Sequence, residues 1–307
     1  MENRIQTIEP KAQSLAAQPP AAETYRIALA QTSPILGDRR RNAEQHRLLL
    51  ERARDERARL TIFPELSLTG YFLRDMVPDV ALAADAAELR ELAEHAGDAS
   101  LICGFVEQSS SYRFYNSALV AHAGRIVHLH RKVYLPTYGM FEEGRDFAAG
   151  EVFRSFDAPW GRTGLLICED FWHLSALTIM QAEGVDVLVC VANSPGRGIG
   201  GATLDTAATY RNMSRTYAQL LGAVVILVNR VGFEDGLCFW GGSLVAGPDG
   251  KLLAEAPLFD EALLTVDLDA AELRRQRIIT PLARDERLLL TIEELQRIKK
   301  ARYDRVP

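Results

Sequence analysis

Short apolar runs alternate with longer amphipathic stretches along most of the chain. The apolar runs predict buried strands, which lie at 25–31, 60–63, 101–106, 164–167, 185–191 and 223–228. The amphipathic stretches predict helices at 42–59, 79–96, 174–183 and 202–221. Helices that alternate with buried strands cover the faces of a sheet, so the pattern predicts an α/β fold with a mixed sheet and helices outside.

Turn residues organise the remaining segments. Gly124 separates the strands of a predicted hairpin at 114–123 and 125–130. The segment 131–145 is dense in charge, aromatic residues, Pro and Gly, which is typical of a loop that carries function. A Gly-rich loop is predicted at 229–242. The last three strands are predicted at 243–246, 252–254 and 263–267. They are expected to form a meander that turns at Pro248-Asp249-Gly250.

The two ends of the chain differ from its centre. Residues 1–23 show no periodicity, which predicts an N-terminal extension that is partly disordered, with packing on a partner subunit as the alternative. No linker interrupts the remainder, so 24–307 is predicted to form one domain. Its tail, from about residue 270, is charged and helix-prone, is broken at Pro281, and is expected to contact a neighbouring subunit.

Composition narrows the class of partner. The chain has 307 residues, of which 48% are hydrophobic, and its net charge of -6 supplies no basic field for nucleic acid or an anionic membrane. Small molecules are therefore the expected partners. No signal peptide or membrane-spanning run is apparent, and the four cysteines form no Cys-x-x-Cys pair, so a reducing cytoplasm without disulfides is expected.

Three chemically reactive residues each follow a predicted strand. Glu65 follows Leu-Thr-Ile-Phe-Pro, Lys132 follows the second hairpin strand, and Cys168 follows Gly-Leu-Leu-Ile. Cys168 alone fits a small core residue better than a reactive thiol, because free cysteine is usually buried. A carboxylate and an ammonium beside it would favour a nucleophile, since the ammonium stabilises the thiolate and the carboxylate accepts its proton.

These residues lie in three segments that resemble the signature blocks of the nitrilase superfamily of carbon–nitrogen hydrolases. The segments are Phe-Pro-Glu-Leu-Ser-Leu-Thr-Gly-Tyr at 63–71, Arg-Lys-Val-Tyr-Leu-Pro at 131–136 and Ile-Cys-Glu-Asp at 167–170. The resemblance extends from about residue 25 to at least residue 266 and implies a nitrilase-like four-layer αββα sandwich. Within the superfamily, 135–143 and 228–235 are most similar to the glutaminase-type domain of glutamine-dependent NAD synthetases and to free-standing amidases.

The resemblance implies a role for each block. Cys168 is expected to attack an amide carbonyl and form a thioester. Glu65 is expected to act as general base, and Lys132, with the backbone N–H of Glu169, to stabilise the oxyanion. Glu143 matches a second family glutamate that holds the lysine, and it fits the spacing better than Glu142 does.

Substrate contacts are also implied by the resemblance, at Tyr138, Glu169, Trp172 and Ser194. Neither His130 nor His173 belongs to the signature blocks, so a Cys-His pair is not expected despite their nearness in sequence to Lys132 and Cys168. The sequence contains no metal-ligand spacing such as His-Glu-x-x-His, and neither a metal nor a cofactor is predicted.

The predicted activity is hydrolysis of the carbon–nitrogen bond of a small amide, of the glutamine or ω-amide type, through a cysteine thioester that releases ammonia. An N-carbamoyl amine or amino acid is the alternative substrate for the same residues, and nitrile hydrolysis is less favoured. The chain ends at Pro307 without a Ser-Gly-Gly pyrophosphate loop, so ammonia is expected to pass to solution or to a separate synthetase that this chain would serve as a subunit. A catalytically silent scaffold is a third alternative. The resemblance further implies a homodimer or higher homo-oligomer.

Overall fold

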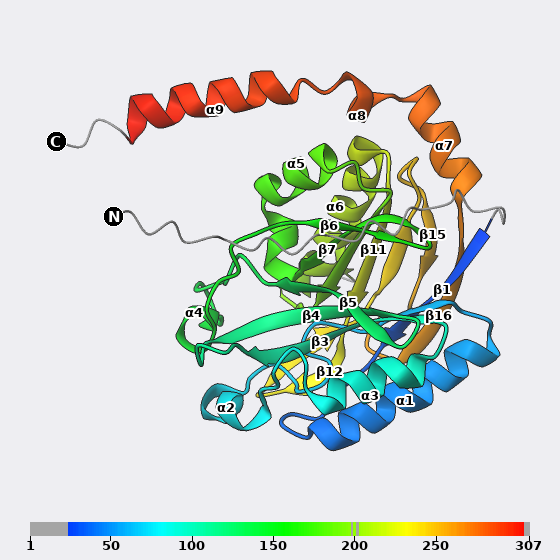
Figure 1. The fold of residues 1–307 in the computed structure, drawn as a ribbon, viewed down its shortest axis with the longest axis vertical. Coiled ribbons are helices and arrows are strands. Elements are labelled where there is room, and N and C mark those ends of the chain that lie inside the picture. Colours follow the sequence, from blue (N-terminus) through cyan, green and yellow to red (C-terminus); the bar gives the residue numbers. More distant parts are fainter. Residues whose placement is uncertain (1–23, 198, 201–202, 304–307) are drawn as a thin grey trace, which may run out of the picture.

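Two six-stranded sheets form the centre of the molecule (Figure 1). The computed structural model describes residues 24–197, 199–200 and 203–303; the predicted N-terminal extension over 1–23 lies outside the described residues. The first sheet has the strand order β16-β1-β2-β3-β4-β5, and the second has the order β15-β14-β11-β8-β7-β6. Helices cover the outer face of each sheet, which confirms the predicted four-layer αββα sandwich.

The elements have the following bounds. The strands are β1 Thr24–Gln31, β2 Leu60–Ile62, β3 Ser100–Gln108, β4 Phe114–His122, β5 Arg125–Arg131, β6 Ser155–Ala158, β7 Gly161–Ile167, β8 Val187–Ala192, β9 Ile199–Gly200, β10 Thr203–Leu204, β11 Val224–Asn229, β12 Val231–Glu234, β13 Leu237–Trp240, β14 Leu244–Ala246, β15 Leu252–Glu255 and β16 Ala262–Asp269. The helices are α1 Arg39–Asp55, α2 Val77–Val80, α3 Ala87–Ala96, α4 Glu143–Asp146, α5 Leu174–Ala182, α6 Asp205–Leu221, α7 Ala270–Ile279, α8 Leu282–Asp285 and α9 Leu288–Arg302, with single 3-10 turns at Arg74–Met76 and Cys168–Trp172.

Alternating side chains of the first sheet enter two different cores. Ile27 and Leu29 of β1 point between the sheets and join the large core that also contains the buried strands of the second sheet. Ala28 and Ala30 point the other way, toward the layer formed by α1 and α3. Because both faces of the strand are buried, the run is apolar at every position rather than at every second one.

Strand direction brings several chain segments to the same end of the sandwich. In the first sheet β2 and β3 are parallel, and β4 reverses direction before β5 reverses it again, so β2 and β5 finish at the same edge. In the second sheet β7 and β8 are parallel and also finish together. Residues that follow β2, β5, β7 and β8 can therefore meet.

The single helix predicted at 79–96 is wrong. The structure has two helices, α2 and α3, separated by an extended segment. Within this segment the backbone N–H of Leu82 donates to the carbonyl of Val106, and the N–H of Gln108 donates to the carbonyl of Leu82. This pairing with β3 requires an extended backbone at Leu82, which a continuous helix could not supply.

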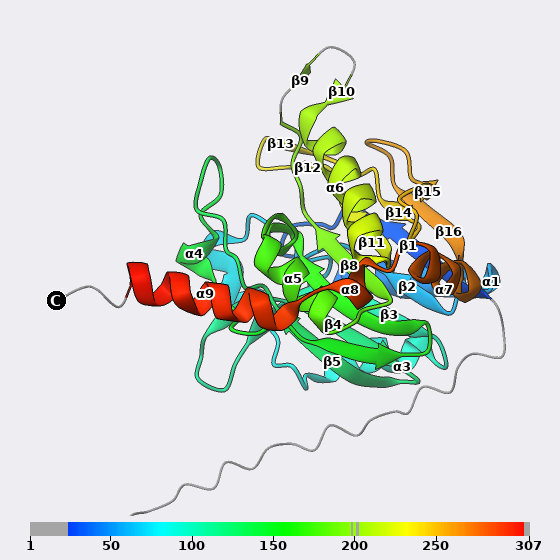
Figure 2. The same ribbon diagram turned by 90° about the horizontal axis from the view of Figure 1, so that it is seen from above.

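The predicted loop at 229–242 is also wrong, because it contains the hairpin of β12 and β13. Its turn residues, Asp235 and Gly236, have φ angles of 49° and 79°. Two consecutive positive φ angles match the right-handed twist of the strands, and Asp-Gly is a typical sequence for such a turn. Figure 2 shows this hairpin beside β9 and β10 at one end of the molecule.

The last strand of the predicted meander belongs to the other sheet. β14 and β15 pair with each other as expected, but β16 pairs antiparallel with β1 along all eight residues of β1. An apolar alternating pattern identifies a strand without identifying its neighbour, since either sheet edge supplies the same backbone partners. Within the described part of the chain, no helix is both long and apolar enough to cross a membrane.

Candidate active site

Glu65 lies just beyond the end of β2 and is fully buried. Pro64 precedes it and has no N–H with which to continue the strand ladder. The carboxylate accepts hydrogen bonds from Asn116 Nδ2 at 2.7 Å and from the backbone N–H of Asn193 at 2.6 Å. Since β8 ends just before Asn193, this contact joins the two sheets at the site.

A glycine on the neighbouring strand allows this turn to lie so close. A Cβ atom at Gly104 of β3 would stand 2.7 Å from the carbonyl carbon of Glu65 and 2.8 Å from the carbonyl oxygen of Pro64. On the same turn, Ser67 Oγ lies 2.9 Å from Nε2 of the buried His46. The position of Glu65 is therefore set by backbone packing as well as by its own hydrogen bonds.

Lys132 is the first residue after β5, and its side chain is also fully buried. Its Nζ donates to Oε1 of Glu65 at 2.8 Å and to Oε1 of Glu143 at 2.7 Å. Burial by itself would lower the pKa of Lys132, but the charges of Glu143 and Glu65 outweigh it and hold the pKa well above its usual value. Lys132 is therefore an ammonium at neutral pH.

Glu143 begins the short helix α4 in the loop that follows β5. Its Oε1 also accepts the hydroxyl of Tyr71 at 2.5 Å, whereas Oε2 is buried with no hydrogen-bond partner among the described residues. Burial raises the pKa of Glu143 to about 7, opposed by Lys132 and reinforced by the charge of Glu65. Two carboxylates share one ammonium here, and burial makes the negative charge of Glu143 unfavourable.

Cys168 lies where β7 ends and starts a single 3-10 turn. Its φ angle of 45° falls in the left-handed region, which is uncommon outside glycine. Burial, and secondarily Glu65, raise the pKa of the Cys168 thiol, while Lys132 lowers it. These opposing charges place the thiol in the same electrostatic cluster as Glu65, Lys132 and Glu143, and their combined effect with burial favours the neutral thiol.

Asp170 connects the Cys168 turn to the segment that carries Lys132. One carboxylate oxygen accepts the backbone N–H groups of Val133 at 3.0 Å and Tyr134 at 2.9 Å. The other accepts the N–H of Ile167 at 3.1 Å and lies 2.9 Å from Nε2 of His130. Asp170 is fully buried, so these four contacts compensate for its lost hydration.

Two of the predicted substrate-binding residues contact each other. The Tyr138 hydroxyl lies 3.0 and 2.9 Å from the two carboxylate oxygens of Glu169. Tyr138 is 49% exposed, whereas Glu169 is 9% exposed. The exposed phenol of Tyr138 and the mostly buried carboxylate of Glu169, the residue after Cys168, form a polar rim.

The other two predicted substrate-binding residues have different surroundings. Trp172 is 37% exposed and donates its indole N–H to the hydroxyl of Tyr210 at 3.0 Å. Ser194 is buried, and its hydroxyl accepts the indole N–H of Trp240 at 3.2 Å. Ser194 is thus bound to the framework through its side chain, while Trp172 retains an exposed edge.

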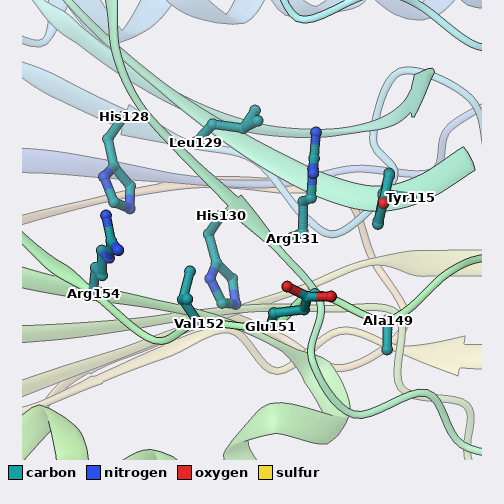
Figure 3. A pocket seen from close by; sticks show the side chains of 10 residues that line it. Tyr115, His128, Leu129, His130, Arg131, Ala149, Glu151, Val152 and Arg154 are labelled. Atoms are coloured by element: carbon teal, nitrogen blue, oxygen red, sulfur yellow. The ribbon is translucent and has the colours of Figure 1, made fainter. Parts of the chain in front are cut away.

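The two histidines near the signature blocks contact carboxylates of the Cys168 turn, and His173 Nε2 lies 3.7 Å from Oε1 of Glu169. His130 pairs with Asp170, and His173 stacks on Tyr134 with 3.5 Å between ring centroids. A cavity of about 430 Å³ lies between β5 and the segment before β6, and Figure 3 shows His130 on its wall. Its lining residues include none of the predicted catalytic or substrate-binding residues.

Comparison with known proteins agrees with this architecture. The family model described as carbon-nitrogen hydrolase matches residues 26–278. The chain belongs to the carbon–nitrogen hydrolase family. This family lies within the nitrilase superfamily, as the signature blocks predicted.

Individual relatives cover the chain to different extents. The glutamine-dependent NAD(+) synthetases of Acinetobacter baylyi and Thermotoga maritima are 30% and 32% identical to this carbon–nitrogen hydrolase. Each match covers 83% of this chain, and it covers 46% and 44% of the respective synthetase. The structure of a carbon-nitrogen hydrolase from Helicobacter pylori is 25% identical, with a TM-score of 0.78, over 89% of this chain and 98% of the other. The chain therefore spans less than half the length of the two NAD(+) synthetases.

Several residues of the site were not identified from the sequence. Tyr71 and Asp170 lie within the quoted signature blocks but carry no functional signal of their own. Asn116 and Tyr210 lie on β4 and α6, where an amide on a strand and a tyrosine on a helix are indistinguishable from core residues. Among the residues that the structure describes, no cluster of three His, Cys, Asp or Glu side chains is arranged to hold a metal ion.

Proposed function

We propose that this carbon–nitrogen hydrolase cleaves a small primary amide, of the glutamine or ω-amide type, through a thioester on Cys168. The observation that carries the proposal is the fully buried ammonium of Lys132, which is shared by Glu65 and Glu143 and acts electrostatically on the Cys168 thiol. Burying these three charged side chains for structural purposes alone is unfavourable. Charged groups lose hydration on burial, and their mutual attraction offsets this loss only in part.

The reaction begins with the thiol. Glu65 removes the Sγ proton as Cys168 Sγ forms a bond to the amide carbonyl carbon. Lys132 Nζ and the backbone N–H of Glu169 donate to the oxygen, which becomes negative in the tetrahedral intermediate. Glu65 then passes its proton to the amide nitrogen, and the carbon–nitrogen bond breaks. Ammonia departs, and a thioester remains on Cys168.

Hydrolysis of the thioester restores the site. Glu65 removes a proton from a water molecule as its oxygen attacks the thioester carbonyl, and the same donors stabilise the second oxyanion. The carbon–sulfur bond breaks, the carboxylic acid product leaves, and the proton held by Glu65 returns to the sulfur. Glu143 keeps Lys132 in place through both steps, as a positioning residue.

Charge complementarity supports a substrate that carries an amino group. Glu169 and Tyr138 form a polar rim near Cys168, and the carboxylate would attract the ammonium of a glutamine-type substrate. Similarity to glutamine-dependent NAD(+) synthetases supports the same substrate class. The same similarity supports the proposal that the ammonia serves a synthetase reaction.

The experiment that tests the proposal is a substrate panel with the full chain. Glutamine, simple ω-amides and N-carbamoyl amino acids are supplied in turn, and ammonia and carbon dioxide are measured separately. We expect ammonia from the ω-amides, a thioester mass on Cys168 after acid quench, and loss of both in Cys168→Ala. The matched control is Cys238→Ala, a half-buried thiol on β13.

Two results would contradict the proposal. Full turnover in Cys168→Ala would exclude the cysteine as nucleophile. Carbon dioxide released together with ammonia, from the N-carbamoyl compounds alone, would assign the alternative substrate class to the same residues.

A further inference from the structure

The hydroxyl of Tyr210 contacts the sulfur of Cys168. Tyr210 lies on α6, is 2% exposed, and its oxygen is 3.5 Å from Cys168 Sγ. Its ring is parallel to that of Phe171 and perpendicular to that of Trp172, so packing on two sides holds the hydroxyl in place. The mechanism above assigns Tyr210 no part, although its hydroxyl touches the reacting atom.

Counting donors and acceptors determines the direction of this hydrogen bond. The indole N–H of Trp172 is only a donor, so the Tyr210 oxygen must accept it at 3.0 Å. The Tyr210 hydroxyl proton then has Cys168 Sγ as its acceptor among the described residues. If the thiol donated to Tyr210 instead, that phenolic proton would be buried without an acceptor, which is unfavourable.

The phenol also remains protonated when the sulfur is charged. Burial raises the pKa of Tyr210 well above its usual value, and negative charge on Cys168 raises it further. Tyr210 therefore does not compete with Glu65 as the base. It stays a donor at every pH at which the enzyme would work.

We propose that Tyr210 is a catalytic residue that stabilises the Cys168 thiolate by donating a hydrogen bond to Sγ, with Trp172 orienting the donor. The proposal rests on the assignment of Cys168 as nucleophile. As Glu65 takes the Sγ proton, charge develops on sulfur and the Tyr210 bond strengthens, because hydrogen bonds to charged acceptors are stronger than those to neutral ones.

The same bond acts again late in the reaction. In the thioester the sulfur is neutral and is a weak acceptor, so the bond contributes little. When the carbon–sulfur bond breaks after water attack, the electron pair returns to sulfur and Tyr210 again donates to it. Loss of the hydroxyl should therefore lower kcat as well as kcat/KM and leave KM nearly unchanged.

The test is Tyr210→Phe, which removes one oxygen and keeps the ring. The rate at which iodoacetamide alkylates Cys168 is measured against pH by mass spectrometry of the peptide that contains Cys168, and folding is checked by thermal unfolding. We expect alkylation at pH 8 to be about tenfold slower, with the pH profile displaced upward, and amide turnover to fall about 10- to 100-fold.

The matched control is Tyr217→Phe. Tyr217 lies two turns further along the same helix and packs on the same Phe171, with 4.9 Å between ring centroids. No hydrogen bond joins it to Cys168 in the described part of the chain. Its alkylation profile and turnover should match those of the unmodified protein.

A folded Tyr210→Phe whose alkylation profile matches that of Tyr217→Phe would overturn the proposal. If Tyr210→Phe does not fold, Trp172→Phe is the deciding variant. Loss of the indole donor should weaken the Tyr210 phenol as a donor and displace the alkylation profile in the same direction. An unchanged alkylation profile in Trp172→Phe would overturn the proposal. Either result leaves the nucleophile assignment intact, since Cys168→Ala tests that separately.

Discussion

The carboxyl group of Glu143 occupies a position where its negative charge is unfavourable. Burial raises its pKa to about 7 from an ordinary value of 4.5, even though Lys132 is 2.7 Å away. The folded protein therefore binds a proton at Glu143 between about pH 4.5 and 7 that the unfolded chain does not bind. Folding stability contributed by this group is present below this window and falls as pH rises through it.

We expect Glu143→Gln to remove this pH dependence, because the amide does not titrate. The free energy of unfolding of the unmodified protein, relative to that of Glu143→Gln, should decrease between pH 5 and pH 8. Urea unfolding at both pH values measures it, with Glu142→Gln, an exposed neighbour, as control. A difference that stays constant or increases would show that Glu143 is ionised throughout the range.

At the scale of the elements, the turn after β2 depends on close contact with β3. Gly104 leaves no room for a side chain beside the backbone of Glu65. The neighbouring atoms are backbone atoms, which cannot rotate away as a side chain can. The position of Glu65 is thus coupled to a strand residue that makes no contact with the reacting atoms.

We expect Gly104→Ala to displace the Glu65 turn and to lower kcat/KM at least tenfold, since small displacements of a catalytic base have large effects on rate. Steady-state turnover and thermal unfolding measure the two consequences. Gly247→Ala is the control, because its Cβ would meet only the side chains of Asp249 and Leu253. Full activity in Gly104→Ala would show that the turn adapts.

At the scale of the whole molecule, the C-terminal helix α9 exposes an apolar surface. None of its residues is buried, and Leu289 and Leu295 are 75% and 61% exposed. Figures 1 and 2 show α9 at the periphery, beyond α8. Leu174 of α5 is also exposed, at 71%. Exposed apolar patches of this kind mark interaction sites.

We expect α9 to pack on a second copy of this chain, because both α9 and α5 offer exposed apolar side chains. Light scattering after size-exclusion chromatography should give a homodimer or larger assembly. The double substitution Leu289→Asp and Leu295→Asp should reduce the mass to that of one chain, whereas Lys300→Asp, also on α9, should not. A monomeric unmodified protein at micromolar concentration would contradict this prediction.

Local patterns allowed much of the architecture to be predicted. Most strands and helices were predicted close to their observed bounds, and the four-layer arrangement followed from the resemblance of the signature blocks. The errors at 79–96, 229–242 and the last strand arose where pairing with a distant strand or a two-residue turn determines the backbone, and the short elements α4 and β6 were not predicted. Such contacts leave little trace in the periodicity of a segment.

The sequence by itself determined the types of reactive residue and their positions after strands, since a strand ends where its apolar run ends. Only the tertiary structure decided which side chains meet. Glu65 and Lys132 are 67 residues apart and share a hydrogen bond because β2 and β5 finish at the same edge. Tyr210 reaches Cys168 from a helix 42 residues further along the chain. Contacts of this range depend on strand order and helix packing, which are properties of the whole fold.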